Sequence, residues 1–280
     1  MKLRSTFLAL LGAALAIGVS TASTMAQDAR QALAASSSIE EIKKRGVIRI
    51  GLSTFVPWAM PNKNGELGGF EIDVAKKLAE EMGVKLESVP TSWDGIIPAL
   101  IAGKFDVSIS GMSITPERNL TGNFTTPYAN TETVLIANKK LAGAFKSLDD
   151  FNKPNVVIAN RRGATTAVLS EKTFPKAEQL LFDEEGQTLQ ELINGKAYAA
   201  LASVPTPAIW VEKYPDVLFV PDVPALEKTS EAFAVRKGDP DALNFYNNWI
   251  LLHTVDGWLK ERHDYWFKGR AWTSQVPEQN

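Results

Sequence analysis

The chain has 280 residues, of which 45% are hydrophobic and 22% charged, with 30 Lys and Arg against 32 Asp and Glu. A formal net charge of −2 provides no basic surface for a polyanion, so nucleic acid is not expected as a partner. The chain contains no cysteine, which excludes a disulfide framework and a lipid anchor on a cysteine.

The first 26 residues predict a secretory signal peptide. Lys2 and Arg4 form a basic start, an apolar stretch runs from Phe7 to Val19, and the small residue Ala26 suits cleavage. A membrane anchor is the alternative, but the apolar stretch is short and no second run of about 18 apolar residues follows. We therefore expect a mature protein in the periplasm, free of a lipid anchor, that begins with a disordered lead-in over residues 27–38.

From Gly46 onward, short apolar runs alternate with segments of helical periodicity. Strands are predicted at 47–52, 84–89, 105–110, 133–137, 155–159, 197–202, 217–220 and 232–235. Helical spacing marks residues 72–82 and 189–193, and Asp239 followed by Pro240 starts a last long helix. This alternation predicts an α/β fold with mostly parallel sheets.

The stretch ISGMSITPER, residues 109–118, follows a predicted strand with groups that suit an anion. Ser110, Gly111 and Ser113 lie at its carboxyl end, where open α/β sheets bind ligands. Arg118 adds a planar set of donors that fits a carboxylate or phosphate. The alternative is a helix start, in which Thr115 caps the helix and Arg118 is an exposed surface charge.

A second stretch, VVIANRRGATTAVLS (156–170), has the same character. A strand leads to Gly163, and Thr165 and Thr166 then open a predicted helix. Free N–H groups and hydroxyls at a helix N-terminus form an anion site, although simple capping by a threonine explains the same pattern. Together the two strand ends could clamp one carboxylate.

Several motifs in order along the chain carry a family resemblance: GVIRIGLSTFVPW (46–58), the long segment 65–118, FTTPY (124–128), GATT (163–166) and AFAVRKGDPDAL (232–243). Their order and spacing resemble the periplasmic solute-binding proteins of polar amino-acid ABC transporters, the bacterial family 3 binding proteins. The resemblance covers about residues 39–270.

The resemblance implies a type II periplasmic binding protein fold, with two α/β lobes, two crossing hinge strands and a ligand cleft between the lobes. Lobe 1 is expected at 39–137 plus 230–280, and lobe 2 at 138–229. The implied function is capture of an amino acid or related small carboxylate by cleft closure, with delivery to an ABC permease. We expect a monomer without a cofactor and without a metal.

The resemblance also assigns candidate ligand-binding residues. Arg118 is similar to the family arginine that pairs with the ligand α-carboxylate. Gly111 and Ser113 resemble its backbone and hydroxyl partners, and Thr165 resembles the hydroxyl that lobe 2 contributes.

Around the ligand side chain this sequence matches the family, but around the ligand ammonium it departs from the family. Phe55 and Trp93 match the aromatic residues that sandwich the ligand side chain, although core packing would also explain them. At the position of the family aspartate that pairs with the ligand ammonium, this chain has Ser203, which supplies no countercharge. Either another acid such as Glu132 or Asp183 replaces it, or the ligand lacks a free primary amine.

Two arginines directly precede Gly163 and bear on the same question. If Arg161 or Arg162 turns inward, a ligand with a second acidic group is favoured, and if both turn outward they form a solvated basic patch. The alternative to a standard amino acid is an amine-free or N-substituted carboxylate or dicarboxylate, such as a small dicarboxylate, a keto acid or an N-substituted acidic compound.

The rival class is an enzyme, because cyclohexadienyl dehydratases resemble the chain at VPTSW (89–93) and DYWFKGRAW (264–272). Those enzymes use a glutamate as general acid, and the matching position here falls on Thr166 or Ala167. We therefore expect no catalytic residues and no enzymatic activity. A sensory receptor domain is the third class considered, but it requires a membrane span after the module.

Metal and nucleotide motifs are weak. His253 and His263 lie ten residues apart in one helical segment and lack the spacing of a metal pair. No Gly-x-Gly-x-x-Gly or P-loop sequence is present.

Overall fold

The computed structural model describes residues 37–276, so the expected signal peptide and nearly all of the expected lead-in lie outside the described residues. The lead-in was predicted to extend too far, because helix α2 (Ser38–Arg45) already begins at Ser38. The backbone N–H of Ser38 donates to Asp239 Oδ2 at 2.8 Å, which attaches the start of α2 to the cap of the helix that begins at Pro240.

Lobe 1 is built on a five-stranded sheet with the order β4-β1-β5-β13-β6. Its strands are β4 (Lys85–Pro90), β1 (Val47–Leu52), β5 (Val107–Ser108), β13 (Ala234–Val235) and β6 (Asn123–Phe124). Strand β1 is parallel to β4 and β5, and β13 is antiparallel to both of its neighbours. The helices and the small hairpin of this lobe are α2, α3 (Phe70–Glu81), α4 (Ile96–Ile101), α5 (Pro116–Thr121), α11 (Pro240–Val255), α12 (Trp258–His263), β2 (Met60–Pro61) and β3 (Leu67–Gly68).

Lobe 2 is built on a second sheet with the order β11-β7-β10-β8-β9, and β12 pairs with β7. Its strands are β11 (Leu218–Phe219), β7 (Ala129–Asn138), β10 (Ala199–Ser203), β8 (Val157–Arg161), β9 (Glu178–Phe182) and β12 (Glu227–Glu231). Strands β10, β8 and β9 are parallel. Its helices are α6 (Lys139–Ala142), α7 (Leu148–Phe151), α8 (Thr165–Thr173), α9 (Glu185–Ile193) and α10 (Thr206–Lys213).

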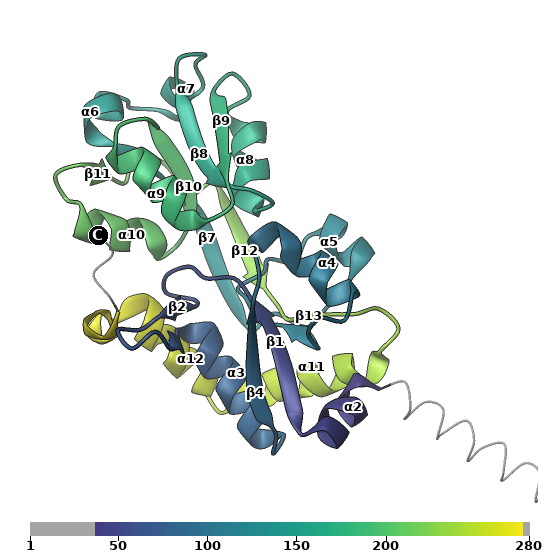
Figure 1. Ribbon diagram of the computed structural model, residues 1–280. Coiled ribbons are helices and arrows are strands. Elements are labelled where there is room, and N and C mark those ends of the chain that lie inside the picture. Colours follow the sequence, from purple (N-terminus) through teal and green to yellow (C-terminus); the bar gives the residue numbers. More distant parts are fainter. Residues whose placement is uncertain (1–36, 277–280) are drawn as a thin grey trace, which may run out of the picture.

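Two antiparallel strands, β7 and β12, connect the lobes and run side by side between them (Figure 1). Their register pairs Glu227 with Thr133 and Glu231 with Ala129. The expected two-lobed fold with crossing strands is therefore present. The lobe boundaries predicted at 137/138 and 229/230 remain predictions.

All eight predicted strands are found, but the two-residue strands β2, β3 and β6 and the longer strands β9 and β12 were missed. Strand β12 reads EKTSE, and its residues are mostly exposed or half-buried, because it lies at the surface of the connection between the lobes. A strand without an apolar face carries no hydrophobic alternation for sequence analysis to detect.

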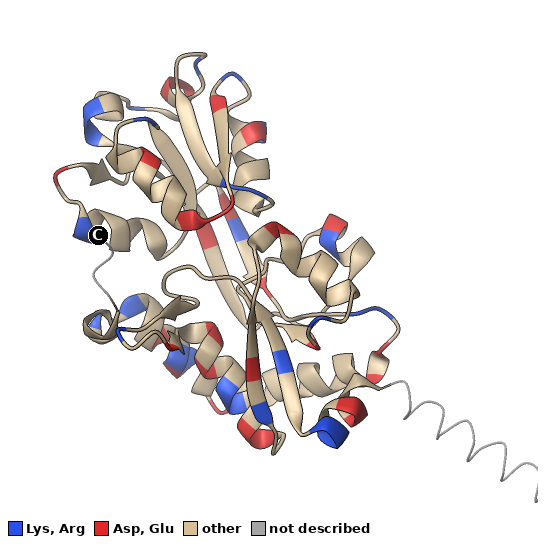
Figure 2. Cartoon of the chain, in the orientation of Figure 1, with Lys and Arg blue, Asp and Glu red and all other residues tan. Residues whose placement is uncertain are grey.

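Each lobe has its own hydrophobic core. In lobe 2, Leu135 and Ile136 of β7 belong to two different clusters on opposite faces of the sheet, because successive strand residues point to opposite sides. Charged residues occur on the helices and loops of both lobes in the view of Figure 2. No helix in the described part of the chain is both long and apolar enough to span a bilayer.

A buried pair of carboxyl groups lies in lobe 1 at the base of the connecting strands. The hydroxyl of Tyr128 donates to the carboxylate of Glu71 at 2.7 Å, and Trp58 Nε1 donates to Glu231 Oε2 at 3.2 Å. Burial raises the pKa of Glu71 well above its usual range, and the nearby Glu231 adds to the shift. Burial also raises the pKa of Glu231 to about 8, against the opposing hydrogen bond from Trp58. Glu231 ends β12, so a neutral carboxyl group is the form that fits the end of this connecting strand.

We expect the stability of the protein to fall as pH rises toward 8 because of Glu231. Its folded pKa lies above the unfolded value of about 4.3, so the folded state holds a proton that the unfolded state releases. The contribution of Glu231 to the free energy of unfolding is fully present below the unfolded pKa. As the pH rises from there toward the folded pKa, the free energy of unfolding falls by about 1.4 kcal/mol per pH unit. Glu231→Gln keeps an acceptor for Trp58 and removes the titration, so its melting temperature should exceed that of the wild type by several degrees at pH 8.

The measurement is thermal unfolding by circular dichroism at pH 5, 6, 7 and 8. Glu227→Gln is the matched control, since Glu227 is exposed on the same strand and should leave the wild-type pH slope unchanged. Equal pH slopes for Glu231→Gln and the wild type would show that Glu231 is not protonated in the folded state.

Candidate functional site

A cavity lies between the two lobes, at the carboxyl ends of strands from both sheets, as expected for ligand sites of open α/β sheets. Lobe 1 contributes Phe55, Trp93, Gly111 and Ser113 to its lining. Lobe 2 contributes Ala164, Thr165, Thr166, Leu201, Ser203, Arg161, Glu185 and Thr188. The free volume is about 30 Å³, roughly the share of one liquid water molecule. A larger ligand therefore enters only when the lobes or the lining side chains move.

The structure brings seven of the ten predicted site residues into this one lining: Phe55, Trp93, Gly111, Ser113, Thr165, Thr166 and Ser203. They come from five separate segments of the chain. Their roles in binding remain predictions, but their convergence is a property of the fold.

Arg118 is not part of this lining. It lines an adjoining hollow that shares Ala164 and Thr165 with the cavity, and it contacts both lobes. Its Nη1 donates to the carbonyl of Ser113 at 2.9 Å, and its Nη2 donates to the carbonyl of Gly163 at 3.0 Å. Burial, with the nearby charge of Arg161 as the second cause, lowers its pKa to about 10, so the guanidinium keeps its charge at neutral pH. The exposed surface charge considered as an alternative is not what the structure shows.

The helix-start interpretation of the same segment is nevertheless correct for its first residues. Thr115 caps α5 and accepts the N–H of Arg118 at 3.1 Å, and Pro116 is the first helical residue. Capping and cleft contact therefore coexist, because the cap orients the backbone while the Arg118 side chain turns toward lobe 2.

Gly111 lines the cavity, but its backbone donor is already used. Its N–H donates to the hydroxyl of Tyr128 at 3.1 Å. A Cβ at this position would lie 2.4 Å from Trp58 Cδ1, and φ is +62°, so only glycine fits here. The space that a side chain at Gly111 would need is therefore filled by Trp58.

Thr165 and Thr166 begin α8 without capping it. The N-cap position is Ala164, with no side-chain cap, so threonine capping does not account for the pair. The N-terminus of this nine-residue helix and both threonines face the cavity. A helix N-terminus favours a negative charge nearby.

Gly163 of lobe 2 contacts two side chains of lobe 1. Its carbonyl accepts from Trp93 Nε1 at 3.2 Å as well as from Arg118. Its φ is +72°, and an added Cβ would lie 3.1 Å from Asp94 Cβ. On the other side of the cavity, the Thr206 hydroxyl donates to the carbonyl of Val56 at 2.9 Å. These contacts define a closed arrangement of the lobes.

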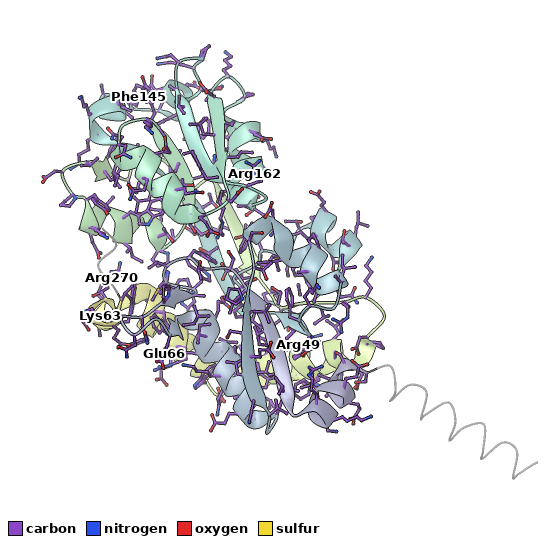
Figure 3. All side chains as sticks on the ribbon, viewed as in Figure 1. Arg49, Lys63, Glu66, Phe145, Arg162 and Arg270 are labelled. Atoms are coloured by element: carbon purple, nitrogen blue, oxygen red, sulfur yellow. The ribbon has the colours of Figure 1, made fainter. Side chains whose placement is uncertain are left out.

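The two arginines before Gly163 point in opposite directions. Arg162, which Figure 3 labels beside the end of β8, is half-exposed and pairs with Asp183 at 3.0 Å. Arg161, the last residue of β8, is only 8% exposed and lines the cavity. The structure therefore does not place Arg162 in the cavity lining, because neighbouring residues at a strand end face opposite sides and Arg161 takes the inward one.

Ser110 also differs from the expectation. It is completely buried behind the cavity, where its hydroxyl bonds that of Ser108 at 2.8 Å, and it is not part of the lining. The two acids suggested as substitutes for the family aspartate do not reach the cavity either. Glu132 pairs with Lys228 at 3.1 Å on the connecting strands, and Asp183 pairs with Arg162.

The acid inside the cavity is Glu185, which sequence analysis missed. Its carboxylate lies 3.8 Å from Arg161 Nη1, and its side chain is 16% exposed. Burial raises the pKa of Glu185, and Arg161 opposes the shift. The available signal was weak: Glu185 opens α9 directly after β9, which was itself not predicted.

Neither histidine belongs to the cavity lining. The ring nitrogens of His253 bond Glu81 and Asp256, both at 2.8 Å, and His263 stacks on Phe267. Within residues 37–276, His, Cys, Asp and Glu side chains form no group of three suited to a metal ion.

Comparisons with known proteins agree with this geometry. The family model of the bacterial extracellular solute-binding proteins, family 3, matches residues 48–269. The L-cystine-binding protein TcyJ of Escherichia coli is 28% identical over 93% of this chain and 97% of its own length. The cyclohexadienyl dehydratase of Pseudomonas aeruginosa is 25% identical, covering 90% of this chain and 91% of its own. The solved structure of a lysine-complexed ABC transporter binding component from Wolinella succinogenes is 36% identical, with a TM-score of 0.77 over 82% of this chain and 99% of that one.

We predict that Gly163→Ala prevents full closure of the lobes, because the new Cβ would contact Asp94 across the cleft. Small-angle X-ray scattering should then give a larger radius of gyration than for the wild type. Gly195→Ala is the matched control: its φ of +70° imposes the same backbone strain, of about 1 kcal/mol, but nothing lies within 4 Å of the added Cβ. Identical scattering from both variants would argue against Gly163 as a closure contact.

Proposed function

Because the chain belongs to the bacterial extracellular solute-binding proteins of family 3, we propose that it captures an amino acid or a related small carboxylate by closing its lobes and delivers it to an ABC permease. The family match spans residues 48–269. Relatives such as the L-cystine-binding protein support a role in amino-acid transport.

The observation that carries the proposal is the position of Arg118. It is a charged, partly desolvated side chain held at the end of a rigid segment and bonded to a carbonyl of each lobe. A carboxylate offers this guanidinium two charge-assisted hydrogen bonds in place of neutral carbonyl partners. Ligand binding and lobe closure therefore use the same side chain.

The lobes close because the ligand binds the closed state more tightly than the open state. Lobe 1 provides Arg118 and the Ser113 hydroxyl for the carboxylate. Lobe 2 adds Thr165 and the N-terminus of α8, which reach the ligand only in the closed arrangement. A ligand that contacts both lobes binds the closed state more tightly and shifts the population toward it.

The partners and location follow from the same family. The relatives are periplasmic binding proteins, and we propose export of this chain by its N-terminal signal peptide, without a lipid anchor. The mature protein acts as a monomer, and its closed form is recognised by the membrane permease. No cofactor enters this mechanism.

A dehydratase is the second candidate function, and one observation favours it. Glu185 is a carboxyl group in the cavity whose pKa burial raises, as general acids require. However, Thr166 and Ala167 stand where the dehydratase resemblance calls for the glutamate, and Ser203 stands at the position of the aspartate. We therefore propose binding without catalysis.

Ligand binding should raise the melting temperature of the purified, ligand-stripped protein. A ligand at 100 times its dissociation constant adds about 2.7 kcal/mol to the unfolding free energy.

Arg118→Gln should weaken the binding of the best carboxylate by about 2–5 kcal/mol, the usual effect of removing one partner of a buried charge pair. Arg162→Gln, which removes an exposed arginine near the same site, should leave the affinity unchanged. An Arg118→Gln protein that binds as well as the wild type would remove the basis of the proposal.

We expect no turnover of prephenate. Prephenate incubated with the purified protein should decay at the rate of a protein-free buffer sample, measured by its absorbance over time. A faster loss that disappears in Glu185→Gln would establish the dehydratase function instead.

A further inference from the structure

The aromatic clamp of this protein is already occupied by its own arginine. The guanidinium carbon of Arg161 lies 4.6 Å from the ring centroid of Phe55 and 4.1 Å from that of Trp93. Both rings belong to lobe 1 and Arg161 belongs to lobe 2, so this cation–π contact crosses the cleft. A cationic ligand group cannot stack in the same place without displacing Arg161 against the repulsion of a like charge.

The polar atoms around this arginine are incompletely paired. Nε and Nη1 of Arg161, Oε2 of Glu185 and the Thr188 hydroxyl are all buried without a hydrogen-bond partner. The 3.8 Å between Arg161 and Glu185 is an ion-pair distance but too long for a hydrogen bond. Buried polar groups in folded proteins are almost always paired, so this cluster calls for a polar ligand group.

The charges of the cavity are also unbalanced. The guanidinium carbons of Arg118 and Arg161 lie 5.7 Å and 4.1 Å from the centroid of the same Trp93 ring, so two positive charges share one side of the cleft. Among the described residues that line the cavity, Glu185 is the only acid, so at most one of the two positive charges is balanced. A zwitterionic amino acid adds no net charge, and Ser203 offers no countercharge to its ammonium. Only a ligand with net negative charge neutralises the pair of arginines.

There is room for such a ligand to extend. A second hollow, lined among others by Val56, Met60 and Trp210, shares Phe55 and Glu185 with the cavity. A ligand anchored at Arg118 and Arg161 can therefore place its remaining atoms in this mostly apolar hollow.

Resting on the proposed function, we infer that the ligand is a small acid with two carboxylate groups, one held by Arg118 and the second by Arg161, which thereby acts as the specificity-determining residue. The second carboxylate takes the free Nε and Nη1 donors of Arg161 and keeps that side chain within the clamp. Cationic and neutral amino acids are disfavoured.

The test uses calorimetric titration of the full chain with ligand pairs that differ in one charge: L-glutamate against L-glutamine, and glutarate against its monoamide. L-Lysine and L-arginine serve as cationic probes. We expect each diacid to bind at least about tenfold more tightly than its amide, which corresponds to about 1.4 kcal/mol. Arg161→Gln should reduce this preference to about threefold or less, while Arg161→Lys should retain part of it.

Two further variants make the test specific. Arg162→Gln should keep the full preference, since that side chain pairs with Asp183 outside the cavity. Glu185→Gln should tighten diacid binding, because it removes the competing negative charge beside Arg161. Melting temperatures of all variants establish that each is folded before titration.

The outcomes separate this inference from the proposed function. If L-lysine, L-arginine or L-glutamine binds as tightly as the diacids, and Arg118→Gln still abolishes binding, the inference fails while the carboxylate-binding function stands. If no carboxylate of either kind binds, both fail. A diacid preference that persists unchanged in Arg161→Gln assigns the second carboxylate to another residue and also overturns the inference.

Discussion

The closed arrangement of this protein depends on the hydrogen bonds that Arg118 makes to the carbonyls of Ser113 and Gly163, one in each lobe. A guanidinium has several donors in a fixed plane, so one side chain can bond both lobes and still approach a ligand. Gly163 suits this contact, because its φ of +72° favours glycine and an added Cβ would lie only 3.1 Å from Asp94 Cβ. The rest of the site is arranged around this contact.

Behind the site, buried contacts of individual side chains hold the lobe 1 segments together. Trp58 packs against Gly111 and donates to Glu231, and Tyr128 connects Gly111 to Glu71. Neutral carboxyl groups are the forms that suit this dry environment, because ionisation without a countercharge would be unfavourable. The cavity-lining backbone is thus held by a buried polar cluster instead of by the ligand.

Membership of the family establishes a solute-binding fold but leaves the ligand open. A cystine-binding protein and a dehydratase are both similar to nearly the whole chain, which shows that the same scaffold serves different chemistry. In this chain the distinguishing features are three side chains that lobe 2 contributes to the cavity lining. Ser203 lacks a charge, Arg161 enters the aromatic clamp, and Glu185 provides the single acid.

The sequence by itself determined the α/β alternation, all eight predicted strands, the cap of the last long helix at Asp239 and most of the cavity-lining residues. These follow from local periodicity, capping chemistry and motif order, which are readable one segment at a time. Tertiary structure alone decided which of Arg161 and Arg162 faces the cleft, that Gly111 accommodates Trp58, and that Glu185 is the acid of the cavity. The first depends on the twist and alternation at one strand end, and the other two depend on contacts between segments far apart in the chain. No local pattern encodes such contacts, because each becomes favourable only after distant segments of the chain have folded against one another.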